Sequence, residues 1–220
     1  MSIEFGNLSS EFVFLFLPGW TSQPSDIFEI LSDRVDEDDH WCILNQTFRG
    51  HQWFEYGSVL DGSTKNYDYY VSLLNLNYKE KSQLDETINY VDDTVSKINK
   101  KVVLLGTSQG ATVAFHYFHS HVRSENVVGL WLHNMAGFYP ELLDKTKNYS
   151  YFTYNDIKKK NRHSVFDDDV INHMNRSLSV MKKRIKNRVF FYNSMNDDIV
   201  PGNFKNIMMK KLSSIYDFYQ

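Results

Sequence analysis

Residues Val102–Phe115 read VVLLGTSQGATVAF, and this stretch decides the fold class. A continuous apolar run predicts a buried strand that ends at Gly106, and small and apolar residues resume at helical spacing after Gly110. Ser108 lies between them in a sharp strand-to-helix turn. Such a turn crowds its own backbone, so it requires small residues two places before and two places after the serine. We therefore expect Ser108 to project from the strand end beside the free N–H groups of a helix N-terminus.

The same alternation of strand and helix continues on both sides of this turn. Short, nearly continuous apolar runs predict buried strands, and segments with apolar residues at three- and four-residue spacing predict helices. The expected strands are Phe12–Leu17, Trp41–Leu44, Val102–Leu105, Val127–Leu132, Val189–Tyr192 and Ile215–Tyr219. The expected helices are Ser25–Val35, Gln83–Asn99, Ala111–Val122 and Asn203–Leu212. This alternation predicts the α/β class, with a mostly parallel sheet covered by helices on both faces.

The segment from about residue 139 to residue 187 lacks a strong strand signal and is rich in charged residues. We expect it to form an inserted helical cap over the carboxyl edge of the sheet, where the parallel strands end. A chain of 220 residues suits one sizeable domain. The sequence therefore predicts a single domain over residues 1–220 that carries this insertion.

Composition and charge narrow the class of protein. A formal net charge of −3 gives no indication of nucleic-acid binding by bulk charge. Cys42 is the one cysteine, so no internal disulfide can form, which fits a reducing compartment. The first apolar run, Phe12–Leu17, is far too short to span a bilayer and follows acidic rather than basic residues. We therefore expect a cytoplasmic protein without a transmembrane segment.

Four stretches resemble the phospholipase/carboxylesterase group of α/β-hydrolases, which includes the acyl-protein thioesterases, or the related family of small serine hydrolases. GTSQGA, at 106–111, is similar to the turn that carries the nucleophile in that group. Leu17–Trp20 follows the first strand where the group has its oxyanion loop, and Arg49–Glu55 is similar to its Arg-x-Trp-Phe-Asp segment. Asn196–Pro201 is similar to the segment that carries the acid of the catalytic triad. The four stretches also occur in the order that the group has.

The resemblance implies a serine hydrolase of esters or thioesters, with a small-molecule or acyl substrate and neither cofactor nor metal. It implies that Ser108 is the nucleophile and that Asp197 is the acid, with the neighbouring Asp198 as the less favoured alternative. It also implies that the backbone N–H groups of Trp20 and Gln109 bind the oxyanion. Candidates for lining an acyl pocket are the aromatic residues Trp53, Phe54 and Phe138. A role in the core or at the rim is the alternative for these three residues.

The base of the triad is the part of the pattern that this sequence departs from. The order in this fold is serine, then acid, then histidine, yet none of the eight histidines follows Asp197. The chain can be a shortened form, it can be a member without catalysis, or a histidine from elsewhere can act as the base. Among internal histidines we expect His133 to be best placed, because it ends the strand beside the nucleophile strand. His163 and His173 lie in the expected cap and could fold over the site.

Three functions therefore stay open at the level of sequence. The first is a serine carboxylesterase or thioesterase, and the second is a non-catalytic module of the same fold that binds a ligand or partner. The third is another doubly wound fold that holds a phosphate at the turn, although the lysine of a P-loop is missing. The histidines of HYFHSH, at 116–121, follow the nucleophile turn without a metal-binding spacing, so we expect no metal there.

Overall fold

A computed structural model describes the chain in ten ranges: 2–47, 52–54, 78–120, 122–139, 143, 149–156, 166–183, 188–195, 202–216 and 218–219. Its strands form one eight-stranded sheet in the order β1-β3-β2-β4-β5-β7-β6-β8. Edge strand β1 runs antiparallel to β3, and all other neighbours are parallel. This confirms the expected α/β class with a mostly parallel sheet.

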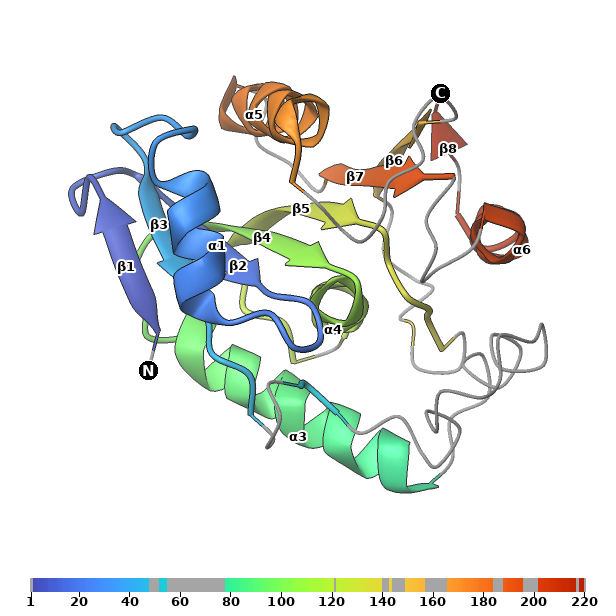
Figure 1. Ribbon diagram of the computed structural model, residues 1–220. Coiled ribbons are helices and arrows are strands. Elements are labelled where there is room, and N and C mark those ends of the chain that lie inside the picture. Colours follow the sequence, from blue (N-terminus) through green and yellow to red (C-terminus); the bar gives the residue numbers. More distant parts are fainter. Residues whose placement is uncertain are drawn as a thin grey trace.

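The elements alternate along the chain as the sequence predicts (Figure 1). The strands are β1 Ile3–Gly6, β2 Phe12–Leu17, β3 His40–Ile43, β4 Lys101–Thr107, β5 Val127–His133, β6 Ser150–Asp156, β7 Arg188–Ser194 and β8 Phe218–Tyr219. The helices are α1 Pro24–Leu31, α3 Tyr78–Val95, α4 Gln109–Phe118, α5 Asp168–Lys183 and α6 Gly202–Ser213. Each strand and helix expected from the sequence is present, with ends that differ by a few residues. The alternation missed β1 and β6.

Helices cover both faces of the sheet, because the central strands are apolar on both sides. Along β4, Val102 and Leu104 belong to a core cluster shared with α3, α4 and α6, while Val103 and Leu105 belong to a second cluster shared with α1 and α5. Figure 1 shows α3 and α4 on one side of the sheet and α1 and α5 on the other. The two cores hold the central strands rigidly, so the carboxyl ends of β2, β4 and β5 meet at one edge.

The expected helical cap over residues 139–187 is wrong for the part of it that the structure describes. β6 is an integral strand that pairs with β7 over its whole length. α5 packs against the face of the sheet at β5 and β7 rather than over its carboxyl edge. The physical reason lies in residues 150–154, SYFTY, of which three are aromatic and one is β-branched, as strands favour, and in the apolar stripe of α5. Polar neighbours in the sequence obscured both signals.

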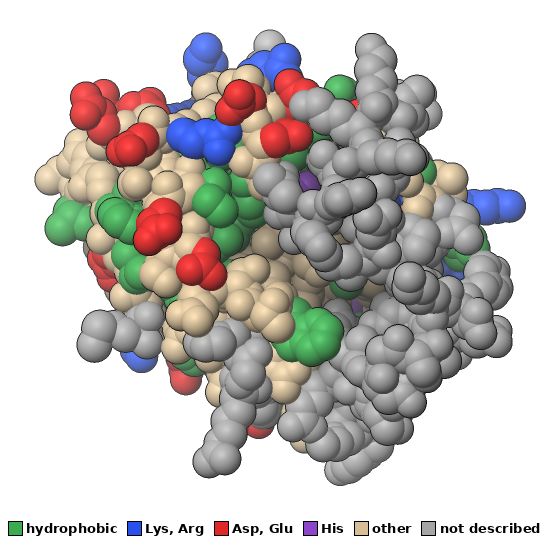
Figure 2. Space-filling view, viewed as in Figure 1, with side chains coloured by type: hydrophobic (Ala, Val, Ile, Leu, Met, Phe, Trp, Pro, Cys, Tyr) green, Lys and Arg blue, Asp and Glu red, His purple; other side chains and the backbone are tan. Residues whose placement is uncertain are grey.

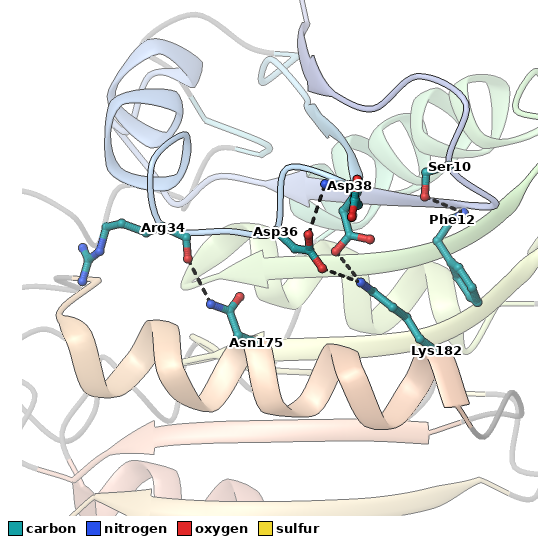
Figure 3. A network of polar contacts seen from close by, with 8 residues as sticks. Ser10, Phe12, Arg34, Asp36, Asp38, Asn175 and Lys182 are labelled. Atoms are coloured by element: carbon teal, nitrogen blue, oxygen red, sulfur yellow. Dashed lines mark hydrogen bonds and ion pairs between the residues drawn. The ribbon is translucent and has the colours of Figure 1, made fainter.

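Polar contacts fix α5 to the turn between α1 and β3 (Figure 3). The ammonium of Lys182 lies 2.6 Å from a carboxylate oxygen of Asp39 and 3.5 Å from one of Asp36. About two turns earlier, the Asn175 side chain donates a 3.0 Å hydrogen bond to the backbone oxygen of Arg34. Burial raises the pKa of the Asp39 carboxyl, and the Lys182 ammonium opposes that rise. Lys182 therefore compensates a carboxylate that the fold has taken out of water.

Charged side chains of both signs are mixed on the face that Figure 2 displays. Acidic side chains gather over the side that holds α1 and the turn before β3, with lysine or arginine among them. This distribution agrees with the small net charge of the chain.

Candidate active site

Ser108 occupies a strained turn between β4 and α4. Its backbone has φ 52° and ψ −118°, a conformation that residues with a side chain rarely adopt. Its carbonyl oxygen accepts the N–H of Thr112 at 3.2 Å, which begins the first turn of α4. Thr107 and Gln109 on either side are buried, whereas Ser108 is partly exposed. The turn therefore leaves Ser108 partly exposed between two buried residues at the carboxyl end of β4, as the sequence predicts.

The two glycines that flank the serine are required by close backbone approaches, as the spacing predicts. A Cβ on Gly106 would lie 2.6 Å from both the Cα of Ala111 and the carbonyl oxygen of Gly110. A Cβ on Gly110 would overlap the backbone of Leu17, with its carbonyl carbon at 2.7 Å. Gly106 thus allows α4 to fold back onto β4, and Gly110 allows the end of β2 to touch the start of α4.

The loop after β2 lies directly against the serine. A Cβ on Gly19 would lie 3.3 Å from the Cβ of Ser108. Two side chains fasten this loop: the Gln46 amide donates to the carbonyl oxygen of Gly19 at 2.8 Å, and the Trp53 indole N–H donates to that of Pro18 at 2.7 Å. Trp20, expected to supply an oxyanion donor, follows next and has an exposed side chain. The loop is therefore held beside Ser108 by its backbone.

Gln109 contributes to the site through its backbone and to the core through its side chain. It is the first residue of α4, so its N–H has no acceptor one turn earlier in the helix. Its side-chain oxygen accepts the N–H of Trp53 at 2.9 Å, and its amide donates to the oxygen of Phe54 at 2.7 Å. An N–H at the helix start and a buried anchor fit a preorganised oxyanion donor.

The three aromatic residues expected to line a substrate pocket lie in the core. Trp53, Phe54 and Phe138 are all fully buried in the cluster around α4. Contact with an acyl chain stays a prediction for them. What the structure adds is that the Trp53 and Phe54 backbones receive the Gln109 side chain, so they support the turn.

His133 touches the turn but makes no side-chain hydrogen bond to Ser108 among the described contacts. Its backbone oxygen accepts the N–H of Ser108 at 2.9 Å. Its imidazole is fully buried, with Nδ1 3.3 Å from Thr107 Oγ1 and Nε2 3.0 Å from the Asn134 amide nitrogen. Burial, followed by the charges of Lys205 and His173, lowers the pKa of His133 to about 3. Both nitrogens are engaged and protonation is disfavoured, so these contacts do not suit the base role.

Part of the expected site lies outside the described residues. This holds for Asp197 and the whole of Asn196–Pro201, for the ends Arg49 and Glu55 of the matching segment, and for His163. The described chain reaches Met195, whose N–H donates to the Asp156 oxygen at 2.8 Å. β7, which precedes the acid segment, therefore ends at the same edge of the sheet as β4 and β5.

Sequence reasoning missed a buried lysine behind the turn. Lys205 of α6 is fully buried, and its ammonium donates to the side-chain oxygen of Asn134 at 2.8 Å. The sequence contained a signal for this burial. Lys205 lies three residues before Met208 and seven before Leu212, so it shares the apolar stripe of α6. A lysine at such a position is either exposed at the end of its stem or paired inside the protein.

The described histidines of the HYFHSH stretch have core contacts. The ring nitrogen Nε2 of His116 accepts the N–H of Tyr139 at 3.0 Å, and His119 bonds both the Phe115 oxygen and the Tyr151 hydroxyl at 2.7 Å. Within the described ranges no group of three or more histidine, cysteine or acidic side chains is arranged to hold a metal ion. None of the helices that the structure describes is both long and apolar enough to cross a membrane.

The arrangement defines the α/β-hydrolase fold, and comparison with solved structures gives the same fold. The chain is similar to acyl-protein thioesterase 2 of Zea mays (TM-score 0.53, 12% identity, covering 97% of this chain and 98% of that one). It is similar to a phospholipase/carboxylesterase of Dyadobacter fermentans (TM-score 0.55, 12% identity, 97% and 96% covered). A third similar structure is YahD with malic acid (TM-score 0.55, 16% identity, 98% of both chains covered).

At these identities the likeness establishes the fold. No protein-family model matches the chain. No curated protein matches it either.

Proposed function

We propose that this protein is a serine hydrolase that cleaves a carboxylic ester or thioester through an acyl-enzyme on Ser108. The observation that carries the proposal is the strained backbone of Ser108, at φ 52°, with Gly19 packed against its side chain. Strain of this size persists only where the surrounding structure enforces it, and it is common at reactive residues. The esterases and thioesterases of the same fold support the choice of substrate class.

The reaction follows from the groups that surround the serine. The Ser108 hydroxyl gives its proton to the base and attacks the acyl carbon, and the N–H groups of Gln109 and Trp20 stabilise the negative charge that develops on the acyl oxygen. The base delivers that proton to the alcohol or thiol, which leaves. The base then takes a proton from water as the water attacks the acyl-enzyme, and it returns this proton to the Ser108 oxygen when the acid is released. Asp197 orients the base through a hydrogen bond and stabilises its protonated form.

The topology of the sheet suggests which histidine supplies the base. On the side of β7 away from β5, the neighbouring strand is β6, which precedes β7 in the chain. From the end of β6 at Asp156, nine residues lead to Phe166, whose ring centroid lies 5.3 Å from that of His133 and 5.5 Å from that of Phe16. His163 is one of these nine residues.

Both described ends of this segment lie toward the carboxyl edge of the sheet. Four strand spacings separate β6 from β2, or about 19 Å, and ten residue steps reach about 33 Å when extended. His163 is therefore the histidine that we assign as the base. The chain order would be Ser108, His163, Asp197, which departs from the order usual in this fold. Triads of one geometry are known in several chain orders.

A fluorophosphonate probe tests the proposal, because it labels only an activated serine. We expect labelling of the wild-type protein and none of Ser108→Ala. Among the histidine variants, His163→Ala should lose labelling by about 10⁴-fold or more, while His173→Ala should keep it. Asp197→Asn should lose labelling, and the matched control Asp198→Asn should keep it. No labelling of folded wild-type protein would refute the enzyme, and full labelling of His163→Ala would refute that base.

One observation favours a second candidate, a binding protein of the same fold without catalysis. His133 is hydrogen-bonded to the turn, and both of its ring nitrogens are engaged, which does not suit a base. The same probe decides between the two functions. A folded wild-type protein that stays unlabelled, with hydrolysis of p-nitrophenyl esters at the background rate, would favour the second candidate.

A further inference from the structure

A fully buried ammonium joins the ends of two strands behind the turn. Lys205 Nζ donates to the Asn134 side-chain oxygen at 2.8 Å and to the backbone oxygen of Ser194 at 2.6 Å. Asn134 follows β5 directly, and Ser194 is the last residue of β7. The two acceptors thus lie at the carboxyl ends of β5 and β7, which are neighbouring strands of the sheet.

The hydrogen bonds fix the direction of a longer network. The Asn134 side-chain oxygen also accepts the N–H of Ser194 at 2.8 Å, so two donors define it as the oxygen. The Asn134 amide nitrogen therefore faces His133 Nε2, which has to accept. The proton of His133 is then on Nδ1, where it donates to Thr107 Oγ1. Donors run in one sense from Lys205 through Asn134 and His133 to Thr107, the residue before Ser108.

The network stabilises an arrangement that would otherwise be costly. Asn134 has φ 48°, which asparagine tolerates better than most residues, so the costly part is the buried lysine. Transfer of a cation from water into the interior is costly unless hydrogen bonds compensate it, and an apolar residue of similar volume is often tolerated as well or better. A lysine on the apolar stripe of α6 is therefore not explained by packing alone.

The position of the network relative to the expected acid gives it a role. Ser194 lies three residues before Asp197, and Lys205 lies eight residues after it. The bond between Lys205 and Ser194 therefore joins described residues on either side of the expected acid, and the bond to Asn134 ties this point to the end of β5. Ser108 is tied to the same point, since its N–H bonds the His133 backbone oxygen.

We propose that Lys205 is a positioning residue that fixes the end of β7, at Ser194, relative to Ser108 through Asn134 and His133. This role rests on the proposed hydrolase function. It deepens that function by assigning a residue that does not touch the substrate. Its signature is a loss in the rate of the chemical step without a loss in binding, because the acyl group has no contact with the ammonium.

The test compares Lys205→Met with Lys210→Met, an exposed lysine of the same helix. We expect Lys205→Met to lower kcat for p-nitrophenyl acetate and the maximal rate of fluorophosphonate labelling by about 10- to 100-fold, with KM unchanged, because small misplacements of reacting groups have effects of this size. Lys210→Met should behave as the wild type. Lys205→Arg should recover part of the rate, because a guanidinium can donate to both acceptors.

A second variant keeps the test valid if Lys205→Met does not fold. Asn134→Asp retains an oxygen for Lys205 and Ser194 but replaces the donor to His133 by an acceptor. We expect a lower labelling rate and a new pH dependence between pH 5 and 8, because a carboxylate beside His133 favours its protonation. Wild-type rates in folded Lys205→Met, or in Asn134→Asp at every pH, would overturn the positioning role of Lys205 and leave the hydrolase function standing. An unlabelled wild type would overturn the hydrolase function, and this role with it.

Discussion

Replacement of Gly106 by alanine tests the close packing on which the turn depends. The added Cβ would lie 2.6 Å from the Ala111 Cα and from the Gly110 oxygen, whereas ordinary contacts begin at 3.4 Å, so 3.4 − 2.6 leaves 0.8 Å to be made up. The atoms in the way belong to the backbone of the first turn of α4, which cannot rotate aside as a side chain can. The start of α4 has to move away from β4, and Ser108 has to move with it.

The expected cost follows from this displacement. Overpacking of a close-packed interior destabilises proteins by about 1–3 kcal/mol, and a clash with backbone alone belongs at the upper end, about 3 kcal/mol. A shift near 1 Å at reacting groups lowers rates by about 100-fold. Gly106→Ala should therefore lose about 3 kcal/mol in the free energy of unfolding and about two orders of magnitude in labelling of Ser108.

Gly129→Ala is the matched control, because Gly129 is also a buried strand glycine without a positive φ. Its Cβ would meet the sulfur of Met181 at 2.5 Å, the far part of a side chain that can change rotamer. We expect a loss below about 1 kcal/mol there. Urea unfolding followed by circular dichroism gives both free energies. Equal losses in Gly106→Ala and Gly129→Ala would refute the argument that backbone contacts at the turn set the cost.

Three further predictions concern acid, one ion pair and the nucleophile. The pKa values of buried His116 and His133 are lowered to about 3, so the unfolded chain takes up protons on these histidines before the folded protein does as the pH falls. The stability that is present above about pH 6.5 should therefore be lost toward pH 3. Urea titrations should show a loss of about 2 kcal/mol for each histidine between pH 6.5 and pH 5. His116→Gln should remove the His116 share, about 2 kcal/mol, from that loss of stability, and an unchanged loss would contradict the prediction. Lys182→Met should destabilise the protein by about 1–3 kcal/mol at pH 7, because the substitution leaves the Asp39 carboxylate buried without its cation. The loss should be smaller at pH 4, because protonation of Asp39 removes the buried charge. Equal losses at both pH values would contradict this prediction. Ser108→Ala should leave the unfolding free energy within about 1 kcal/mol of wild type or raise it, since its strain serves no packing, while labelling is abolished; a larger loss would show a structural serine.

The sheet and the serine turn could be predicted because their signals are local. A buried parallel strand is apolar on both faces, and this is visible in any short window such as Phe12–Leu17. The glycines at 106 and 110 follow from the turn itself, since the atoms that crowd them lie within a few residues or at the adjoining strand. The resemblance to α/β-hydrolases rested partly on this turn, and the fold comparison agrees with that resemblance.

The sequence pattern did not predict the structure where a segment or side chain depends on the distant residues that it contacts. β6 has strand-forming residues in SYFTY, but its pairing with β7 across 30 or more residues of sequence makes it a sheet strand rather than part of a cap. Lys205 shows an apolar stripe position without showing its acceptors, which come from β5 and β7. The sequence likewise favoured His133 as a base from its place at a strand end, and only its neighbours reveal that both nitrogens are engaged.

The sequence by itself therefore determined a parallel α/β sheet and a serine raised at the end of β4, because steric and hydrophobic rules act between near neighbours. Only the tertiary structure decided that β6 stands beside β7 and that Lys205 is buried with its ammonium bonded to Asn134. Strand order and hydrogen-bond partners depend on residues far apart in the chain, and no local window contains them.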